Sequence, residues 1–258
     1  MFRICSGCGC TIEPNKEFCI VCGAKQSVPS EDEPIAPNTD VPHGFVVTIS
    51  QIMADGSDGL TCTIAGSEGA DHIIGRSKGE LRFQEDQTIE ERHARLYWDN
   101  GGLWVEDLGS MNGIYVRISS PAFLLDGDQF IAGEQLFRYE PYSTESRSVN
   151  GVEFTGSSIR EWNFRLVQIL EGGREGAAWM VSDSAVTLGR DVGPNPFRTD
   201  RFMSQEHCTI SIADGVAQLR DLQSRNGTFV RIKKPRRLKQ DDSLFIGQQL
   251  LSVHFPGS

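Results

Sequence analysis

Short apolar runs separated by turn residues fill the chain from about residue 44 onwards. Near its C-terminus the runs are FRLVQIL, AAWMV, AVTLGR, HCTISI, AQLRDL, GTFVRI and DSLFIG. Each alternates apolar and polar positions or is continuously apolar, and Gly, Asp, Asn or Pro interrupts them about every 8–12 residues. No apolar pattern with helical spacing extends over three turns. The pattern therefore predicts an all-β protein.

The pattern occurs twice along the chain, and the second copy lies 114 residues after the first. The pairs of residues that keep this spacing are Arg76 and Arg190, His93 and His207, Asn112 and Asn226, Asp128 and Asp242, and Gly133 and Gly247. Further upstream the spacing is 117, so the first copy holds three extra residues near AGSEGAD, where a surface loop tolerates insertion. A repeat of this length predicts two β-sandwiches of about 100 residues each.

Two polar segments divide the chain into parts. The segment QSVPSEDEPIAPNTDVP, residues 26–42, has four prolines, four acidic residues and no aromatic residue, which is typical of a disordered linker. STESRSVNG separates the two copies. The predicted order is a small metal-binding segment (1–25), a disordered linker (26–42), a first sandwich (43–141), a linker (142–160) and a second sandwich (161–258).

The overall charge narrows the class of partner. With 25 basic and 35 acidic residues, the formal net charge of −10 makes nucleic acid an unlikely main ligand. The N-terminus lacks the apolar core of a secretory signal, and no segment holds the roughly 18 apolar residues that would cross a membrane. We expect a cytoplasmic protein with no membrane partner.

A local basic run, RIKKPRRLK at 231–239, stands out from this acidic background. It predicts either a patch for nucleic acid, a membrane or an acidic protein, or a solvated hairpin. Counting strands after the second Asn-Gly turn places the run away from that turn, at the other end of the sandwich.

The N-terminal cysteines form a metal-binding pattern. Cys5 and Cys8 form one Cys-x2-Cys pair, and after ten intervening residues Cys19 and Cys22 form a second. A glycine follows each pair. Four thiolates in this arrangement predict a structural Zn²⁺ site in a short zinc-ribbon segment, whose folding the metal would drive. Disulfides, a redox pair or an iron–sulfur cluster are the alternatives, and Cys10 could compete with Cys8.

Gly189-Arg190, Ser204-x-x-His207 and Asn226-Gly227, in this order on a β background, resemble the signature of the forkhead-associated (FHA) domain. The resemblance covers nearly all of 161–256 and, less faithfully, 44–140. It implies two FHA-type β-sandwiches in tandem, with phosphothreonine peptides bound by loops at one end.

The resemblance assigns roles to individual residues of the second copy. Arg190 and Ser204 would donate to the phosphate, and Asn226 would bond the peptide backbone. Gln205 and Arg225 would assist, whereas Gly189, His207 and Gly227 would be structural. The alternative is that these residues only stabilise turns, since Asn-Gly is a common hairpin signal.

The first copy departs from the signature at the serine position. It keeps Arg76, Asn112 and the structural His93, but Glu90 replaces the serine. A carboxylate beside a phosphate is repulsive, and Arg76 could pair with Glu90 instead. The first copy is therefore expected not to bind phosphothreonine.

These observations favour a non-enzymatic adaptor that binds a phosphothreonine-containing protein, such as a Ser/Thr kinase or its substrate. A phosphorylation-independent scaffold for assembling other proteins is the alternative. Neither a metalloprotease motif, a P-loop nor a nucleophile elbow occurs, so we do not expect an enzyme.

Overall fold

The computed structural model describes residues 3–4, 11–12, 45–67, 69–142, 148–157 and 160–255. Over these ranges the chain forms 23 strands and one 3-10 turn with no α-helix, which confirms the all-β prediction. No helix in these ranges could therefore span a membrane. The four predicted zinc ligands and the linker 26–42 lie outside the described residues.

The first compact unit consists of two sheets. One has the strand order β4-β3-β23-β22-β9-β20, and the other has the order β21-β8-β7-β5-β6. The strands are β3 (Phe45–Ile52), β4 (Asp58–Gly66), β5 (Asp71–Gly75), β6 (Leu81–Arg82), β7 (Ala94–Asp99), β8 (Gly102–Asp107), β9 (Ile114–Arg117), β20 (Thr228–Arg231), β21 (Arg236–Arg237), β22 (Ser243–Ile246) and β23 (Gln249–His254).

The second compact unit has the strand orders β16-β15-β12-β11 and β10-β19-β18-β17. Its strands are β10 (Ala122–Leu124), β11 (Gln129–Ala132), β12 (Gln135–Pro141), β15 (Phe164–Ile169), β16 (Glu175–Val181), β17 (Ala185–Leu188), β18 (Cys208–Ala213) and β19 (Val216–Asp221). The 3-10 turn η1 (Glu171–Gly173) connects β15 to β16.

Two short antiparallel pairs complete the secondary structure. β1 (Arg3–Ile4) pairs with β2 (Thr11–Ile12), and β13 (Ser148–Val149) pairs with β14 (Val152–Glu153). The second pair lies in the predicted linker 142–160 and is closed by a further Asn-Gly turn. Asn150 and Gly151 both have positive φ, 53° and 77°, as a two-residue hairpin turn requires.

The two compact units do not coincide with the two repeats. The first unit takes the chain up to Arg117 together with Phe229 onwards, and the second runs from Ile118 to Thr228. The predicted boundaries 43–141 and 161–258 assume that each repeat closes on itself. In the structure each repeat instead gives its C-terminal strands to the other repeat's unit.

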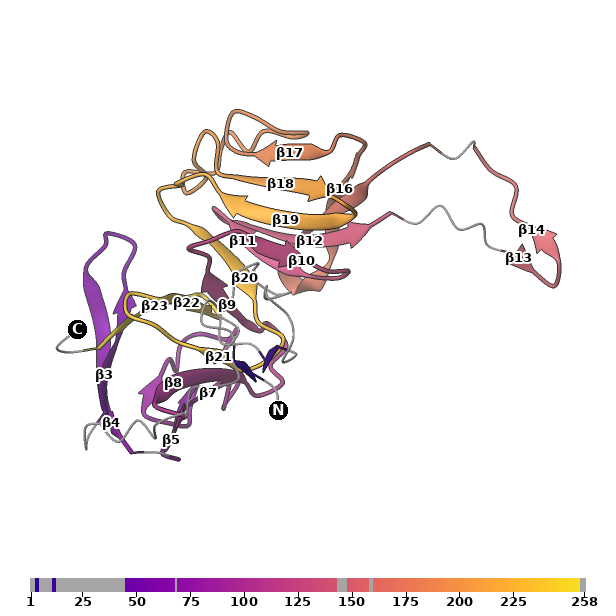
Figure 1. The fold of residues 1–258 in the computed structure, drawn as a ribbon. Coiled ribbons are helices and arrows are strands. Elements are labelled where there is room, and N and C mark those ends of the chain that lie inside the picture. The colour runs from indigo at the N-terminus through magenta and orange to yellow at the C-terminus, as the bar shows by residue number, and fades with distance from the viewer. Residues whose placement is uncertain are drawn as a thin grey trace, which may run out of the picture. The chain divides into compact units, whose positions relative to one another are not determined.

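The strand pairing shows this exchange directly. β3 of the first repeat pairs with β23 of the second, with Ile49 opposite Val253. The equivalent strand of the second repeat, β15, pairs with β12 of the first, with Leu166 opposite Tyr139. In Figure 1 the colours record the same exchange, because magenta β10 lies beside orange-yellow β19.

The chain passes from one unit to the other along two neighbouring strands. β9 and β20 occupy equivalent positions of the two repeats and pair antiparallel with each other. Val116 lies opposite Val230, and these two valines are themselves equivalent, 114 residues apart. Each repeat thus contributes the same strand to this pair, as two identical chains do in a strand-exchanged dimer.

The sequence of the crossing segments favours an extended path. ISSP follows β9 and IKKP follows β20 at equivalent positions. Proline restricts the residue before it to extended conformations, which disfavours an immediate turn back onto the parent unit. The strands that follow β9 are equivalent to those that follow β20. Each set can therefore occupy, in the other repeat's unit, the position that the other set would have filled.

Both hydrophobic cores combine side chains of the two repeats. In the first unit Val47 and Ile49 pack in one buried cluster with Leu251 and Val253. In the second unit the rings of Tyr139 and Phe164 lie 5.3 Å apart between centroids, and both are buried. Removing one donated strand set would therefore expose the core that this set completes.

Cutting the chain between the repeats tests the exchange. We expect that a protease site inserted at 143–147, once cleaved, leaves two fragments that co-elute in gel filtration and separate only in denaturant, because each completes the other's core. Fragments that separate under native conditions, each keeping its circular dichroism spectrum, would show that each repeat closes on itself.

Candidate functional site

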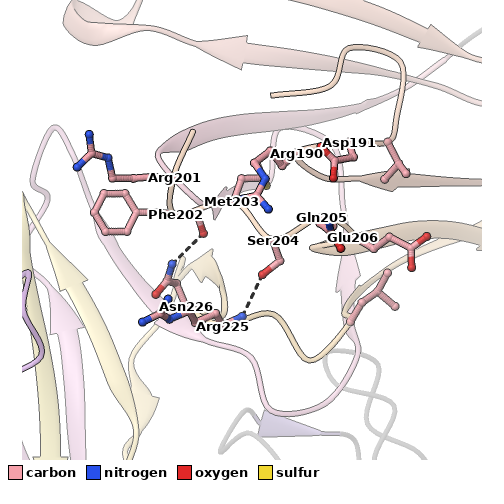
Figure 2. A pocket seen from close by; sticks show the side chains of 12 residues that line it. Arg190, Asp191, Arg201, Phe202, Met203, Ser204, Gln205, Glu206, Arg225 and Asn226 are labelled. Carbon is pink, nitrogen blue, oxygen red and sulfur yellow. Dashed lines mark hydrogen bonds between the residues drawn. The ribbon is translucent and has the colours of Figure 1, made fainter. Parts of the chain in front are cut away.

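The FHA-like motif of the second repeat lies on three loops of the second unit. Arg190 follows β17, Ser204 and Gln205 precede β18, and Arg225 and Asn226 follow β19. These five residues line one open cleft of about 740 Å³. Figure 2 shows Ser204 and Arg190 on one side of it and Asn226 on the other. The structure thus brings together all five predicted binding residues.

A buried histidine joins two of these loops from behind. His207 is fully buried, and its Nδ1 accepts a hydrogen bond from the Ser204 amide at 3.1 Å. Since Nδ1 accepts, the proton lies on Nε2, which donates to the Gly227 carbonyl at 3.0 Å. The imidazole does not line the cleft, so it holds the serine loop against the Asn-Gly turn.

Glycine is required where Arg190 leaves β17. A Cβ atom on Gly189 would lie 2.0 Å from the carbonyl oxygen of Gln205, far inside contact distance. The Arg190 amide donates to the Ser204 carbonyl at 2.8 Å in the same region. This close approach fixes the arginine loop directly beside the serine loop.

Two aspartates, which the sequence analysis did not single out, brace the loops further. Asp200 accepts hydrogen bonds from the amides of Phe202 and Met203 at 2.9 and 3.0 Å. Asp221 accepts from the amide and hydroxyl of Ser224 at 3.0 and 2.6 Å, which shapes the turn before Asn226. The cleft residues therefore sit on loops fixed by buried or half-buried carboxylates.

The polar groups of the cleft leave specific atoms available to a ligand. Ser204 Oγ accepts the Arg225 amide at 3.1 Å, so its hydroxyl proton is free to donate outward. Asn226 Nδ2 donates to the Phe202 carbonyl at 2.8 Å, which leaves Oδ1 and one N–H for a ligand. Within the described part of the chain, the Arg190 guanidinium has no ion-pair or hydrogen-bond partner.

The charges along the cleft are unevenly distributed. Arg190, Arg201 and Arg225 contribute positive charge, and Asp191 and Glu206 contribute negative charge. In Figure 2 Arg201 lies on the Asn226 side, whereas Asp191 and Glu206 lie at the opposite end. The sequence analysis did not identify Arg201 as a site residue, because it lies outside the motif. Its counterpart in the first repeat, Gln87, is also uncharged, so the repeat gives no signal at this position.

The first unit repeats the same backbone arrangement with different side chains. Asn112 Nδ2 donates to the Thr88 carbonyl at 2.8 Å, and the Arg76 amide donates to the Glu90 carbonyl at 2.8 Å. His93 joins the Glu90 amide to the Gly113 carbonyl as His207 joins its counterparts. These hydrogen bonds, which hold the loops, are therefore the same in the two units, whereas some of the exposed side chains on these loops differ.

The expected ion pair between Arg76 and Glu90 is absent from the described interactions. Arg76 Nη1 instead donates to Gln87 Oε1 at 2.8 Å, a residue that the motif does not include. The neighbouring Glu91 pairs with Lys78 at 3.0 Å, and this hydrogen bond lowers the pKa of Glu91. The Arg76 side chain is therefore bonded to a neighbouring loop of its own unit, whereas no such bond holds the side chain of the equivalent Arg190 in the described part of the chain.

The basic run 231–239 contributes nothing to the cleft of the second unit. It belongs to the first unit, where Arg236 and Arg237 form β21 at the edge of a sheet beside β8. The Arg231 guanidinium lies near the carbonyls of Ser110 and Met111, at 3.4 and 3.3 Å. The sequence analysis expected the run in the second sandwich, at the end opposite its Asn-Gly turn, whereas the structure places it in the first unit.

Comparison with known proteins identifies two segments that match the FHA domain, residues 72–133 and 186–247. The segments are related by the same spacing of 114, and each contributes strands to both units. The chain therefore carries two tandem FHA matches on an all-β fold. No curated protein matches the chain.

Two solved structures resemble the chain weakly. The crystal structure of the FHA domain of the CT664 protein from Chlamydia trachomatis is 10% identical, with a TM-score of 0.33, over 81% of this chain and 96% of that one. A structure described in a structural and functional analysis of phosphothreonine-dependent FHA domain interactions is 13% identical, with a TM-score of 0.30, over 83% and 99%.

The burial of His207 predicts a pH dependence of stability. Burial lowers the pKa of His207 below its ordinary value of about 6.5, so the unfolded chain takes up this proton first. Stability should be full above about pH 6.5 and fall with acidification, by up to about 1.4 kcal/mol per pH unit. Chemical denaturation between pH 5 and 8 measures this slope. His207→Gln should be less stable overall and show a shallower slope; an equal slope in both proteins would refute the assignment.

Proposed function

We propose that this protein is a non-enzymatic adaptor that binds phosphothreonine-containing proteins through the second unit, within Ser/Thr kinase signalling. The observation that carries the proposal is the free Arg190 guanidinium beside the outward-donating Ser204 hydroxyl and the exposed Asn226, all in one cleft. The match of residues 186–247 to the FHA domain supports the same conclusion.

A phosphate fits the donors of this cleft. Phosphothreonine carries a charge of about −1.5 to −2 at neutral pH and three acceptor oxygens. The guanidinium of Arg190 offers a charged fork of N–H donors, and Ser204 adds a hydroxyl donor on the adjoining loop. Hydrogen bonds of this kind contribute about 1.5–3 kcal/mol each. Arg225 adds positive charge, and Gln205 is a weaker candidate contact.

Asn226 is placed to bind the peptide rather than the phosphate. Its side chain is fixed by the bond to the Phe202 carbonyl, which leaves the amide edge facing the cleft. A fixed amide can bond both an N–H and a C=O of an extended peptide backbone. Arg201 beyond Asn226 favours an acidic peptide residue on that side.

The first unit lacks these features, and we propose that it does not bind phosphothreonine. Glu90 replaces the donating serine, and a carboxylate about 4 Å from a phosphate oxygen costs about 4 kcal/mol per charge pair near a protein surface. Arg76 is already bonded to Gln87. Met111 stands where the second unit has Arg225 and is 81% exposed.

A phosphorylation-independent assembly role is the second candidate, and exposed apolar residues favour it. On the β13–β14 hairpin and just after it, Val149, Val152 and Phe154 are 58%, 70% and 75% exposed. Apolar side chains grouped on a surface commonly mark a protein contact. This role would persist without any phosphate in the partner.

Fluorescence anisotropy with a degenerate phosphothreonine peptide pool distinguishes the two roles. We expect micromolar binding that Arg190→Ala weakens at least about 100-fold, since two charge-assisted bonds are lost. Ser204→Ala and Asn226→Ala should each cost about tenfold, and the matched variant Arg76→Ala should stay within twofold. Phosphoserine and unphosphorylated pools are the controls. Wild-type protein that shows no phosphate-dependent binding would eliminate the adaptor and leave the assembly role.

We also propose a structural Zn²⁺ held by Cys5, Cys8, Cys19 and Cys22. The described strands β1 and β2 pair antiparallel, with Arg3 opposite Ile12, and the connection between them carries the first Cys-x2-Cys pair. A hairpin closed by such a pair suits a zinc ribbon, since two thiolates of one turn can share a metal. The site would stabilise this segment without taking part in phosphate binding.

Metal analysis of the purified chain tests the zinc proposal. We expect about one zinc per chain, lost on Cys5→Ser or Cys19→Ser because three thiolates hold the metal far less tightly. Cys10→Ser and Cys62→Ser should keep the metal. A metal-free protein whose N-terminal cysteines do not react with a thiol reagent would instead indicate disulfides.

A further inference from the structure

The phosphate-binding loop of the second unit is attached to residues of the first repeat. Asp200 is only 3% exposed, and its Oδ2 accepts hydrogen bonds from the Glu134 amide at 2.8 Å and from Gln135 Nε2 at 2.9 Å. Glu134 and Gln135 lie between β11 and the start of β12, in the strand set that the first repeat donates. Two amide donors from one repeat thus satisfy hydrogen bonds of a buried carboxylate of the other.

The second oxygen of the same carboxylate faces the cleft loop. Asp200 Oδ1 accepts the amides of Phe202 and Met203, the two residues before Ser204. The Phe202 carbonyl in turn accepts the side chain of Asn226. Gln135 is therefore connected through Asp200 to the backbone of Phe202 and Met203, which leads directly to Ser204 and holds the side chain of Asn226.

The orientation of Gln135 within this path is fixed. Its Oε1 accepts a hydrogen bond from Gln168 Nε2 at 2.7 Å, which leaves Nε2 to donate to Asp200. Gly133 approaches the same carboxylate so closely that a Cβ atom there would lie 2.6 Å from Asp200 Oδ2, and its φ is +62°. The donated segment is thus shaped to fit against Asp200.

The first unit contains the reciprocal arrangement. Asp86, equivalent to Asp200, accepts the Gln248 amide at 3.0 Å and Gln249 Nε2 at 2.6 Å. Gln248 and Gln249 belong to the second repeat and are equivalent to Glu134 and Gln135. Each repeat therefore supports the site loop of the other repeat, and Gln249 is a matched internal control for Gln135.

We propose that the first repeat takes part in phosphopeptide recognition as the donor of residues 122–141, with Gln135 as a positioning residue that acts through Asp200. The proposal rests on the proposed function of the second unit. In this proposal the first repeat, in which Glu90 replaces the motif serine, contributes to binding without binding a ligand itself. Loss of one donor to a buried carboxylate lets the loop bearing Ser204 move from its bonded position.

The pair Gln135→Ala and Gln249→Ala tests this proposal in the full-length chain. Phosphothreonine peptide affinity should fall about three- to tenfold in Gln135→Ala and stay within twofold in Gln249→Ala, although both remove equivalent bonds. Gln135→Glu, which keeps the acceptor for Gln168 but faces Asp200 with a second carboxylate, should weaken binding further. Thermal midpoints of all variants show that each protein is folded.

Amide NMR signals report on the site loop itself, and a general loss of stability would not change them selectively. In Gln135→Ala the signals of Phe202 and Met203 should shift while those of Thr88 and Ile89 do not, and Gln249→Ala should show the reverse. Unchanged affinity in both variants, or a loss confined to Gln249→Ala, would overturn the proposal. If the wild-type chain binds no phosphopeptide, the proposed function fails, and the amide signals still decide which glutamine holds the loop.

Discussion

The pairing of β9 with β20 brings the two repeats together at the point where each passes its C-terminal strands to the other. Val116 lies opposite its own counterpart Val230, so the two repeats meet at equivalent strands and the chain crosses between units there. Once it has crossed, the strands that follow can only complete the other repeat's sandwich. Both hydrophobic cores, and the support of both site loops, follow from that crossing.

The candidate site separates groups that build the loops from groups that face a ligand. His207, Asp200 and Asp221 use their hydrogen bonds inward, on backbone amides and carbonyls of the three loops. Arg190 and the Ser204 hydroxyl remain outward and unused. Because the inward groups are equivalent in the two units, the two sites differ in a few outward side chains. In the first repeat Glu90, Gln87 and Met111 stand in place of Ser204, Arg201 and Arg225.

Much of this could be predicted from the sequence because it depends on local pattern. Alternating apolar residues predicted the strands, and the constant spacing of 114 predicted two equivalent units. Arg190, Ser204 and Asn226 could be assigned to one site because the FHA-like motif carries their relationship along the chain.

The exchange could not be predicted from the same pattern. The segments 122–141 and 236–255 are equivalent, so the apolar positions of either segment fit either unit. Which unit each segment joins depends on the path of the chain at ISSP and IKKP. Arg76 was assigned to Glu90 because that residue replaces the motif serine. In the structure the Arg76 guanidinium instead donates to Gln87, although the backbones of Arg76 and Glu90 are bonded to each other. The hydrogen bond between Asp200 and Gln135 could not be predicted either, because the two residues are far apart in the sequence and belong to no common motif.

We propose that phosphothreonine binds in the second unit's cleft and nowhere on the first unit. Amide NMR of the ¹⁵N-labelled full-length chain during titration with a phosphothreonine peptide tests this proposal. We predict saturable shifts at Ser204, Arg225 and Asn226, with none at Glu90 and Asn112. Shifts at the first unit's residues, or equal shifts with the unphosphorylated peptide, would show that the proposal is wrong.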